Sequence, residues 1–360
     1  MTVKIVTIVG ARPQFVKAGA VSRLMAGDER FDEVLIHTGQ HHDDNMSGVF
    51  FEEFGIPRPA HNLNISGGAH GAMTGRMIAA LEEVLIEERP DAVLVYGDTN
   101  STLAGALAAV KLHIPIVHVE AGLRSFNNRM PEEINRVVVD RISSLLLCPT
   151  ETAVANLAQE GIVDGVENVG DVMYDVALFY REAARTKSTI LSDLGIEGRR
   201  FALATCHRAE NTDDTARLAE IVDALAAIAS EMPVVFPLHP RTRKLIAEYG
   251  LEPLLSKIKV LAPVSFLDMV ALEQAAALIL TDSGGVQKEA FFYDVPCVTM
   301  RDETEWVETV ALGRNILAGA NRHKIVDAAL SFPPLSAGEE RPYGSGNASQ
   351  KILSAILTLK

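Results

Sequence analysis

The sequence predicts an α/β fold built from two Rossmann-like, doubly wound domains that face a cleft. Short runs of apolar and β-branched residues, typical of strands covered on both faces, alternate with segments of helical periodicity. The alternation occurs twice along the 360 residues and weakens between residues 171 and 199. Strands that alternate with helices form mainly parallel sheets with right-handed crossovers. We therefore expect an N-terminal domain at residues 1–177 and a C-terminal domain at residues 178–345.

In the first half, β-branched and apolar residues dominate positions 3–9, which we expect to form the opening strand. Apolar side chains recur on one helical face within residues 72–88, at Ile78, Leu81 and Leu85. Thr150 is expected to cap a helix that follows it. The other expected strands are 33–37, 92–96, 114–119 and 145–148, and the other helices are 14–26, 102–112, 132–142 and 172–185.

The second half repeats the pattern. Its expected strands are 201–205, 234–237, 258–261, 277–280 and 296–299, and helices between them include 217–229 and 265–275. Residues 339–349 are rich in Gly, Ser and Pro and predict a loop, and residues 350–359 predict an amphipathic helix. Open α/β sheets bind ligands at the carboxyl ends of their strands, so the cleft should be lined by loops 10–13, 97–101, 119–125, 205–211 and 281–285.

Composition excludes several classes of protein. The formal net charge of -14, without a basic patch, disfavours a nucleic-acid partner. The three cysteines stand far apart in apolar surroundings, which indicates buried thiols of a reducing compartment. We see no signal peptide and no apolar run approaching the roughly 20 residues of a membrane span. The expected location is the cytoplasm.

A glycine pair stands at the end of the fourth strand of the second half. The run 280–289 reads LTDSGGVQKE, so a buried strand breaks at a turn and a helix follows. Gly284 and Gly285 carry no Cβ atom, which lets a ligand approach the backbone and the amides of the helix. This pattern is typical of a phosphate or diphosphate seat, with Glu289 one turn later where it could accept from sugar hydroxyls. The alternative is a plain strand-to-helix turn capped by Ser283.

Acidic residues and a histidine also follow strand ends: Asp98, Glu120, Glu132 and His207. Carboxylates held close together raise one another's pKa, which provides an acid and a base at neutral pH. A histidine could act as an acid, or as a cation against a leaving diphosphate. Simpler roles stay open, with Asp98 as a helix N-cap, Glu132 as a first-turn residue favoured by the helix dipole, and His207 as a loop residue.

Five further polar residues have simpler expected roles. Arg12 and Lys17 add positive charge beside the first strand. His118 lies inside an apolar strand, which favours a structural role. Asn135 and Arg136 are expected to tie loops together.

Metal and nicotinamide sites are not expected. The run 41–44, HHDD, has adjacent residues that point in different directions and no spaced partner to complete a ligand set. The turn 10–13, GARP, is not the Gly-x-Gly-x-x-Gly of dinucleotide-binding folds, and no Gly-x-Ser-x-Gly nucleophile elbow is present. We therefore expect no cofactor.

Taken together, the motifs resemble one family, the non-hydrolysing UDP-N-acetylglucosamine 2-epimerases of bacteria and archaea. The matching segments occur in the family's order from the first strand to about residue 310. They are GARP at 10–13 with Lys17, TGQH at 38–41, GDT at 97–99, HVEAGLR at 118–124, PEExNR at 131–136, PTE at 149–151, HRxEN at 207–211, TDSGGxQxE at 281–289 and RDxTE at 301–305.

The resemblance implies a fold of the glycosyltransferase-B type, usually dimeric, whose last helix (here 346–360) crosses back to the N-terminal domain. It also implies the reaction. UDP is eliminated across C1–C2 of the sugar to give a 2-acetamidoglucal, and UDP adds back after C2 is protonated on the opposite face. UDP-N-acetylglucosamine would thereby become UDP-N-acetylmannosamine, without a nicotinamide.

Carried over position by position, the resemblance gives each site residue a role. Asp98, Glu120 and Glu132 become the acid/base candidates, and His207 assists the departure and return of UDP. Basic residues at the cleft are matched by Arg12 and Lys17. The resemblance also assigns Ser283, Gly284 and Gly285 to the diphosphate seat and Glu289 to the ribose.

Two departures from the family pattern concern the substrate. The best-known members continue Arg-Pro-Glu after the equivalent of Thr304-Glu305, whereas this sequence has Trp306, so an arginine of the substrate pocket is absent. Residues 42–46 differ from the polar set that binds an activating UDP-N-acetylglucosamine in regulated bacterial members. The sequence resembles a branch that includes epimerases of UDP-2,3-diacetamido-2,3-dideoxyglucuronate, which is the main alternative substrate.

Two other classes of function compete with an epimerase. A glycosyltransferase of the same architecture would need an acceptor, and three clustered carboxylates argue against it because inverting transfer needs only one base. A UDP-sugar-binding regulator would not need the full set of Asp98, Glu120, Glu132 and His207.

Overall fold

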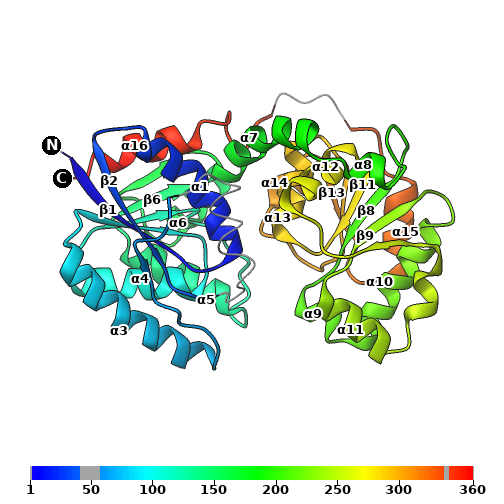
Figure 1. Cartoon of the computed structure of the whole chain (residues 1–360), viewed down its shortest axis with the longest axis horizontal. Helices are drawn as coiled ribbons and strands as arrows, with labels where there is room; N and C mark the ends of the chain where they lie inside the picture. The colour runs from blue at the N-terminus through cyan, green and yellow to red at the C-terminus, as the bar shows by residue number, and fades with distance from the viewer. Residues whose placement is uncertain (1, 41–56, 336–339, 360) are drawn as a thin grey trace. The chain divides into compact units, whose positions relative to one another are not determined.

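The computed structural model describes residues 2–40, 57–335 and 340–359 (Figure 1). The chain divides into two compact units. Unit 1 comprises Met1–Val176 and Arg341–Lys360, and unit 2 comprises Ala177–Glu340. Each unit holds its own parallel sheet flanked by helices, which confirms the predicted α/β class with two doubly wound parts. The cleft expected between them stays a prediction.

Unit 1 contains a seven-stranded sheet in the order β3-β2-β1-β4-β5-β6-β7. Its strands are β1 (Val3–Val9), β2 (Phe31–His37), β3 (His61–Asn62), β4 (Ala92–Tyr96), β5 (Ile116–Val119), β6 (Leu145–Cys148) and β7 (Val166–Asn168). Its helices are α1 (Arg12–Ala26), α3 (His70–Glu88), α4 (Asn100–Lys111), α5 (Pro131–Ile142), α6 (Glu151–Gln159) and α16 (Ala348–Ile356). Helix α7 (Val172–Lys187) continues into unit 2.

Unit 2 contains a six-stranded sheet in the order β10-β9-β8-β11-β12-β13. Its strands are β8 (Ala202–Thr205), β9 (Val234–Pro237), β10 (Lys259–Leu261), β11 (Leu278–Thr281), β12 (Cys297–Thr299) and β13 (Asn315–Leu317). Its helices are α8 (Ile190–Asp193), α9 (Ala209–Thr212), α10 (Thr215–Ile228), α11 (Pro240–Glu248), α12 (Phe266–Ala275), α13 (Gly284–Phe292), α14 (Val307–Ala311) and α15 (Arg322–Leu330), with a 3-10 turn, η1, at Glu252–Lys257.

The apolar runs of the sequence become central strands because both faces of each sheet are covered. In unit 1, Val6 pairs in register with Val34 of β2 and Val93 of β4, and it is fully buried. Leu81 and Leu85 of α3 pack into the same core. Unit 2 has a separate core between its sheet and helices α10 and α15. The three cysteines are buried and unpaired, as expected.

The chain order reverses once in each sheet, beside the strand that opens the unit. Strand β1 lies between β2 and β4, and β8 lies between β9 and β11. Loops that leave such a pair of strands diverge to opposite faces and open a crevice at the carboxyl edge. Four of the five loops predicted to bind a ligand, 10–13, 97–101, 205–211 and 281–285, follow β1, β4, β8 and β11 respectively.

Short edge strands are where the sequence prediction was incomplete. Strands β3, β7 and β13 were not predicted; they are two or three residues long, lie at or near sheet edges, and include polar residues such as His61, Glu167 and Asn315. An edge strand has one neighbour and need not be apolar, so its sequence carries little signal. Helix starts also shifted, as for α4, which begins at Asn100 because Thr99 is its N-cap.

Helix α16 belongs to unit 1 although it ends the chain. It packs against α1, and the two helices lie side by side in Figure 1. Asp175 of α7 accepts hydrogen bonds from the backbone amides of Ala348 (3.1 Å) and Ser349 (2.7 Å) at the start of α16. A carboxylate from another helix therefore caps this N-terminus.

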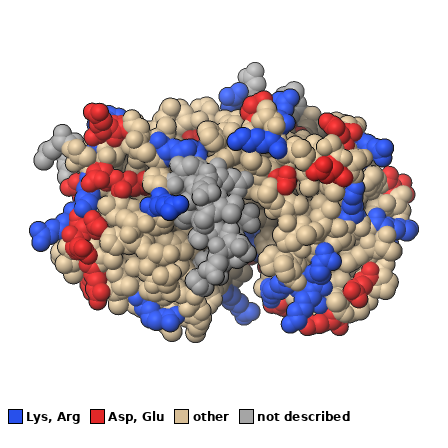
Figure 2. Space-filling view, in the orientation of Figure 1, with Lys and Arg blue, Asp and Glu red and all other residues tan. Residues whose placement is uncertain are grey.

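Surface charge is mixed. On the described part of the face shown in Figure 2, Lys and Arg side chains are interspersed with Asp and Glu. This face presents no extended basic surface of the kind that binds nucleic acid.

Candidate active site

The point in each sheet where the chain order reverses is called the switch point below. In unit 1 it is held by Gln14, a buried residue of α1. Its side-chain oxygen accepts from the amides of Gly10 (2.9 Å) and Ala11 (3.0 Å), and its side-chain nitrogen donates to the carbonyl of Tyr96 (3.0 Å). The loop after β1 is thereby fixed to the end of β4. Gly10 has no room for a side chain, since a Cβ there would lie 2.0 Å from Oγ1 of Thr38.

Glu120 and Lys17 form a nearly buried ion pair at this edge. Their side chains are 9 % and 10 % exposed. Glu120 has a φ of 71°, a left-handed conformation that is uncommon for a residue with a side chain and that accumulates at functional sites. A Cβ on Gly97 would lie 3.0 Å from the Glu120 carboxylate and 3.4 Å from the Lys17 ammonium. The pair therefore packs directly on the Gly97–Asp98 turn.

Asp98 is positioned by two residues of α5. Arg136 donates to its carboxylate at 2.6 Å, and the Asn135 side chain donates to its backbone carbonyl at 2.8 Å. The expected loop-tying role of Asn135 and Arg136 is confirmed. Asp98 is not the N-cap of α4, because Thr99 occupies that position and accepts from Thr102.

The two glutamates that open α5 differ in environment. Glu133 is buried and accepts from the amides of Ser125 (2.9 Å) and Phe126 (3.0 Å) and from Arg136 (2.7 Å). Burial alone would raise the pKa of Glu133, but these donors outweigh it and the pKa is lowered. Glu132 is half-buried on the same turn. Glu133 thus ties a loop, whereas the structure assigns no such bond to Glu132 among the described residues.

Two of the expected acid/base carboxylates lie against cations. Glu120 lies against Lys17, and Asp98 lies against Arg136. The paired groups are of opposite sign because α1 and α5 each bring one cation to the carboxyl edge. Any proton transfer by these carboxylates therefore starts from cation-paired groups.

His118 has the structural role that the sequence favoured. Its ring is fully buried, with Nδ1 2.7 Å from the Asp140 carboxylate and Nε2 2.8 Å from the carbonyl of Gly97. Burial opposes the ionisation of Asp140, but His118 and Arg124 outweigh it and lower the pKa of Asp140. The network fixes the Gly97 carbonyl, and with it the turn that carries Asp98.

In unit 2, a buried carboxylate organises the switch point. Asp282 follows β11 and accepts from the amides of His207 (3.0 Å) and Arg208 (3.0 Å) and from the side chain of Asn211 (3.2 Å). The loop after β8 is thus tied to the glycine turn after β11. This role of Asp282 was not foreseen, because the sequence does not show that the two loops are neighbours.

His207 stands at this turn with 46 % of its side chain exposed, and its Nδ1 lies 3.5 Å from the Asp282 carboxylate. Partial burial is the main factor that lowers the pKa of His207; Asp282 opposes the shift, and Arg208 and His239 add to it. Solvent at the exposed half of the ring should offset part of this shift.

The glycine turn begins α13. Ser283 is its N-cap and accepts from Val286 at 3.5 Å, so the capping role is present alongside any role in binding. A Cβ on Gly284 would lie 3.3 Å from Nε1 of Trp306, 3.8 Å from the Arg208 guanidinium and 3.9 Å from the Glu305 carboxylate. Three polar side chains therefore converge on Gly284. Gly285 is exposed and Glu289 is half-buried one turn later.

Glu289 has an acidic neighbour on α12. Glu273 is buried, and burial together with the Glu289 charge raises its pKa well above the ordinary value. Burial and the neighbouring Glu289 charge therefore favour the protonated form of Glu273. Sequence reasoning missed this pair, because the two residues are 16 positions apart on separate helices.

Two predictions fall outside the description. The backbone of Arg12 starts α1, but its side chain lies outside the described residues. Residues 41–46 also lie outside the described residues. They include the run 41–44, which was not expected to bind a metal, and the segment 42–46, which was compared with the activator site. Within the described ranges, no three His, Cys, Asp or Glu side chains form a group able to hold a metal ion.

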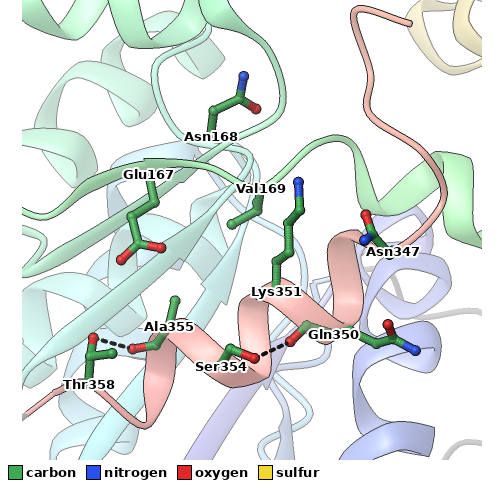
Figure 3. Close-up of a pocket in the computed structure, with 9 residues that line it drawn as sticks. All are labelled: Glu167, Asn168, Val169, Asn347, Gln350, Lys351, Ser354, Ala355 and Thr358. Atoms are coloured by element: carbon green, nitrogen blue, oxygen red, sulfur yellow. Dashed lines mark hydrogen bonds between the residues drawn. The ribbon is translucent and has the colours of Figure 1, made fainter.

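The structure also contains a groove away from these residues. It has a volume of about 420 Å³ and lies between α16 and the segment at β7 in unit 1 (Figure 3). Its lining includes Glu167, Lys351 and Ser354 but none of the predicted site residues. We assign it no function.

Comparison with known proteins decides the family. The family model described as UDP-N-acetylglucosamine 2-epimerase matches residues 23–357. This chain belongs to that family. It is 53 % identical, over 99 % of its length and 100 % of the relative, to the UDP-2,3-diacetamido-2,3-dideoxy-D-glucuronate 2-epimerase of Pseudomonas aeruginosa.

Solved structures of family members have the same fold. One is the UDP-GlcNAc 2-epimerase of Methanocaldococcus jannaschii in complex with UDP-GlcNAc and UDP, with a TM-score of 0.90, 43 % identity and full coverage of both chains. Another is the UDP-GlcNAc 2-epimerase of Neisseria meningitidis bound to UDP-GlcNAc, with a TM-score of 0.90 and 31 % identity over 98 % of this chain and 99 % of that one. The predicted resemblance is thus confirmed, and the chain is an epimerase-family isomerase.

No helix among the described residues of this family member is long and apolar enough to cross a membrane.

Proposed function

We propose that this chain inverts C2 of a UDP-linked 2-acetamido sugar by eliminating UDP and adding it back. The observation that carries the proposal is Glu120, a carboxylate held in a left-handed backbone conformation against Lys17 at the switch point of unit 1. Strain retained at one acidic residue at the carboxyl edge of a parallel sheet is typical of a residue whose position matters for chemistry.

The first half-reaction uses the carboxylates of unit 1. One carboxylate removes the proton from C2, and the C2–H electron pair forms the C1=C2 double bond. The C1–O bond breaks, and UDP leaves with its electron pair. A carboxyl group on the other face of the glycal then protonates C2 as UDP adds to C1. We propose Asp98, Glu120 and Glu132 for these proton transfers.

Residues of unit 2 are proposed to hold the departing UDP. The amides at the start of α13, beginning at Gly284 and Gly285, would stabilise the diphosphate charge, with Ser283 beside them. His207 would offer a ring that takes up a proton as that charge develops. We propose that Glu289 accepts from the ribose. In unit 1, Arg12 and Lys17 are proposed to add positive charge.

Two substrates fit this reaction. UDP-N-acetylglucosamine is the substrate named for the family and for the relative from Methanocaldococcus jannaschii, at 43 % identity. The second candidate is UDP-2,3-diacetamido-2,3-dideoxyglucuronate, which the 53 % identity of the Pseudomonas aeruginosa relative favours. Both substrates undergo the same chemistry at C1 and C2.

Incubation with each substrate in D2O, followed by NMR at C2, tests the reaction and the substrate together. Turnover should place deuterium at C2 and yield the 2-epimer. Exchange with the diacetamidouronate alone would select the second candidate. A sugar transferred to an added acceptor without exchange at C2 would instead establish a glycosyltransferase, and tight binding without any turnover would establish a regulator.

Amide substitutions test the proposed roles. Asp98→Asn and Glu132→Gln should each lower kcat by orders of magnitude while UDP affinity changes little, because the amide keeps the shape and loses the proton transfer. Glu151→Gln is the matched control, since Glu151 occupies the first turn of α6 as Glu132 occupies that of α5. Full activity in both test variants would contradict the role assignment.

We also propose, on the resemblance alone, a cytoplasmic homodimer. Light scattering coupled to size-exclusion chromatography should give about twice the chain mass of 38.9 kDa. A single-chain mass at assay concentration would contradict the dimer without affecting the proposed chemistry.

A further inference from the structure

The indole of Trp306 lies beside the glycine turn at the start of α13. Its side-chain nitrogen lies 3.3 Å from the point where a Cβ on Gly284 would stand. The residue is 6 % exposed, so the ring is fixed by its surroundings. An indole N–H is a donor only, and buried indole nitrogens usually serve a specific acceptor.

The backbone around Trp306 is anchored to α13 itself. The amide of Trp306 donates to the hydroxyl of Thr304 (3.1 Å), and that hydroxyl donates to the side chain of Gln287 (2.7 Å). The carbonyl of Trp306 accepts from the Thr309 hydroxyl at 2.7 Å. The indole is therefore held in a fixed position relative to the first turn of α13.

A buried cation stands behind the ring. The Lys288 ammonium lies 3.9 Å from the ring centroid, and Lys288 is 2 % exposed. An ammonium against the face of an indole is attracted to the ring and withdraws electron density from it, which makes the N–H a stronger donor.

The neighbouring carboxylate does not oppose an anion here. Glu305 lies 3.9 Å from the same point, but Arg301 pairs with it at 3.1 Å, and the Arg208 guanidinium stands 3.8 Å from the point. Arg208 is thus the cation near Gly284, while Arg301, which also pairs with Glu210 at 3.3 Å, offsets the charge of Glu305. This arrangement fits a phosphate group, which accepts strong hydrogen bonds.

We propose that Trp306 is a nucleotide-binding residue. Its indole N–H donates to a phosphate oxygen of the UDP diphosphate at Gly284, and Lys288 strengthens this bond through the ring. The inference rests on the proposed UDP-sugar function and adds a neutral donor to a site otherwise served by backbone amides and cations. The best-known family members have arginine at this position, and arginine is also a hydrogen-bond donor.

The chain provides its own probe, because Trp306 is its single tryptophan. Titration with UDP should change the intrinsic fluorescence of the native protein in a saturable way, whereas uridine, which has no phosphate, should cause little change. Equal responses to the two ligands, or none to UDP at concentrations that calorimetry shows to be saturating, would overturn the inference.

Two variants separate the donor from the ring. Trp306→Phe keeps an aromatic ring for Lys288 and removes the N–H. Its UDP affinity by calorimetry should fall roughly 10-fold to 100-fold, the range for a lost hydrogen bond to a charged group, while uridine affinity is retained. Lys288→Met should weaken UDP binding by a smaller factor. Val307→Ala, at a neighbouring exposed position, should bind UDP as the native protein does.

The outcomes distinguish this inference from the proposed function. Unchanged UDP affinity in Trp306→Phe overturns the inference even if the native protein epimerises its sugar. A selective loss of UDP affinity supports it even if no tested sugar is epimerised. Absence of UDP binding by the native protein overturns both. Retained uridine affinity in Trp306→Phe shows that the variant is folded, and the fluorescence titration of the native protein needs no variant.

Discussion

Glu120 and Gly97 show how single residues shape the edge of the unit 1 sheet. Both have left-handed backbones, with φ values of 71° and 61°, and the Glu120 carboxylate lies 3.0 Å from where a Cβ on Gly97 would be. Only glycine adopts this conformation freely, so Gly97 leaves space that the Glu120–Lys17 pair occupies. The position of the carboxylate thus depends on a missing side chain.

Substituting Gly97 tests this dependence. Gly97→Ala should cost about 1–2 kcal/mol of stability from backbone strain and should also reduce kcat strongly, because the new methyl group displaces Glu120 or Lys17. Gly195→Ala is the matched control: its φ is 64°, but no atom lies within 4 Å of the added carbon. Thermal unfolding and kcat are measured for both. Loss of activity in the control, or none in Gly97→Ala, would contradict the steric account.

Glu273 makes stability depend on pH. Its pKa in the folded chain is raised well above the unfolded value of 4.5, so the folded state keeps a proton that the unfolded chain releases. The contribution of Glu273 to stability is therefore fully present below pH 4.5. It falls by up to about 1.4 kcal/mol per pH unit as the pH rises towards the pKa of Glu273 in the folded chain.

Glu273→Gln keeps the shape of the side chain and removes this titration. The variant should therefore gain in Tm relative to the native chain as the pH is raised from 5 to 8. Glu252→Gln, at an exposed position of η1, controls for the loss of one negative charge. A Tm difference independent of pH, measured by thermal unfolding, would show that Glu273 is already ionised in the folded protein.

At the scale of elements, α16 depends on a cap supplied by α7. Its own N-cap residue, Asn347, makes no capping bond with its side chain, whereas Asp175 accepts from the first two amides of the helix. A negative charge at a helix N-terminus is also favoured by the helix dipole. The last helix is thus fixed to unit 1 by a residue near the point where α7 leaves that unit.

Removal of this cap should loosen α16. Asp175→Ala should cost roughly 0.5–2 kcal/mol and increase hydrogen exchange of the α16 amides. Asn347→Ala should have a much smaller effect. Equal protection of α16 in native protein and Asp175→Ala, measured by hydrogen exchange with mass spectrometry, would contradict the capping role.

At the scale of the whole molecule, each unit has a hydrophobic core of its own among the described residues. We expect calorimetric unfolding to show two transitions, because each core can melt without the other. UDP should mainly stabilise unit 2, adding about 2.7 kcal/mol to its free energy of unfolding at a hundredfold excess over the Kd. The midpoint of the unit 2 transition should therefore rise. Trp306 fluorescence should follow that transition, since the single tryptophan lies in unit 2.

A single cooperative transition, followed identically by tryptophan fluorescence and circular dichroism, would contradict independent unfolding. UDP should shift the transition that Trp306 fluorescence reports. If UDP instead shifts the other transition, the assignment of the nucleotide-binding site to unit 2 is contradicted.

Much of the fold could be predicted from local pattern. Strands β1, β4, β6 and β9 were predicted with their observed bounds, because central parallel strands need uninterrupted apolar residues on both faces. Three edge strands, β3, β7 and β13, were missed, since an edge strand carries no such requirement. Candidate site residues could be named because polar groups directly after buried strands have few structural reasons to be there.

The sequence by itself therefore determined the elements, the α/β class and the segments that resemble an epimerase. Tertiary structure decided which groups become partners. It brought Lys17 to Glu120, Glu273 to Glu289 and Trp306 to Gly284, pairs that stand 103, 16 and 22 positions apart. Local sequence sets backbone conformation over a few residues, whereas these contacts depend on the order of strands in each sheet. That order is set by packing of the whole unit, so it was not visible in any one segment.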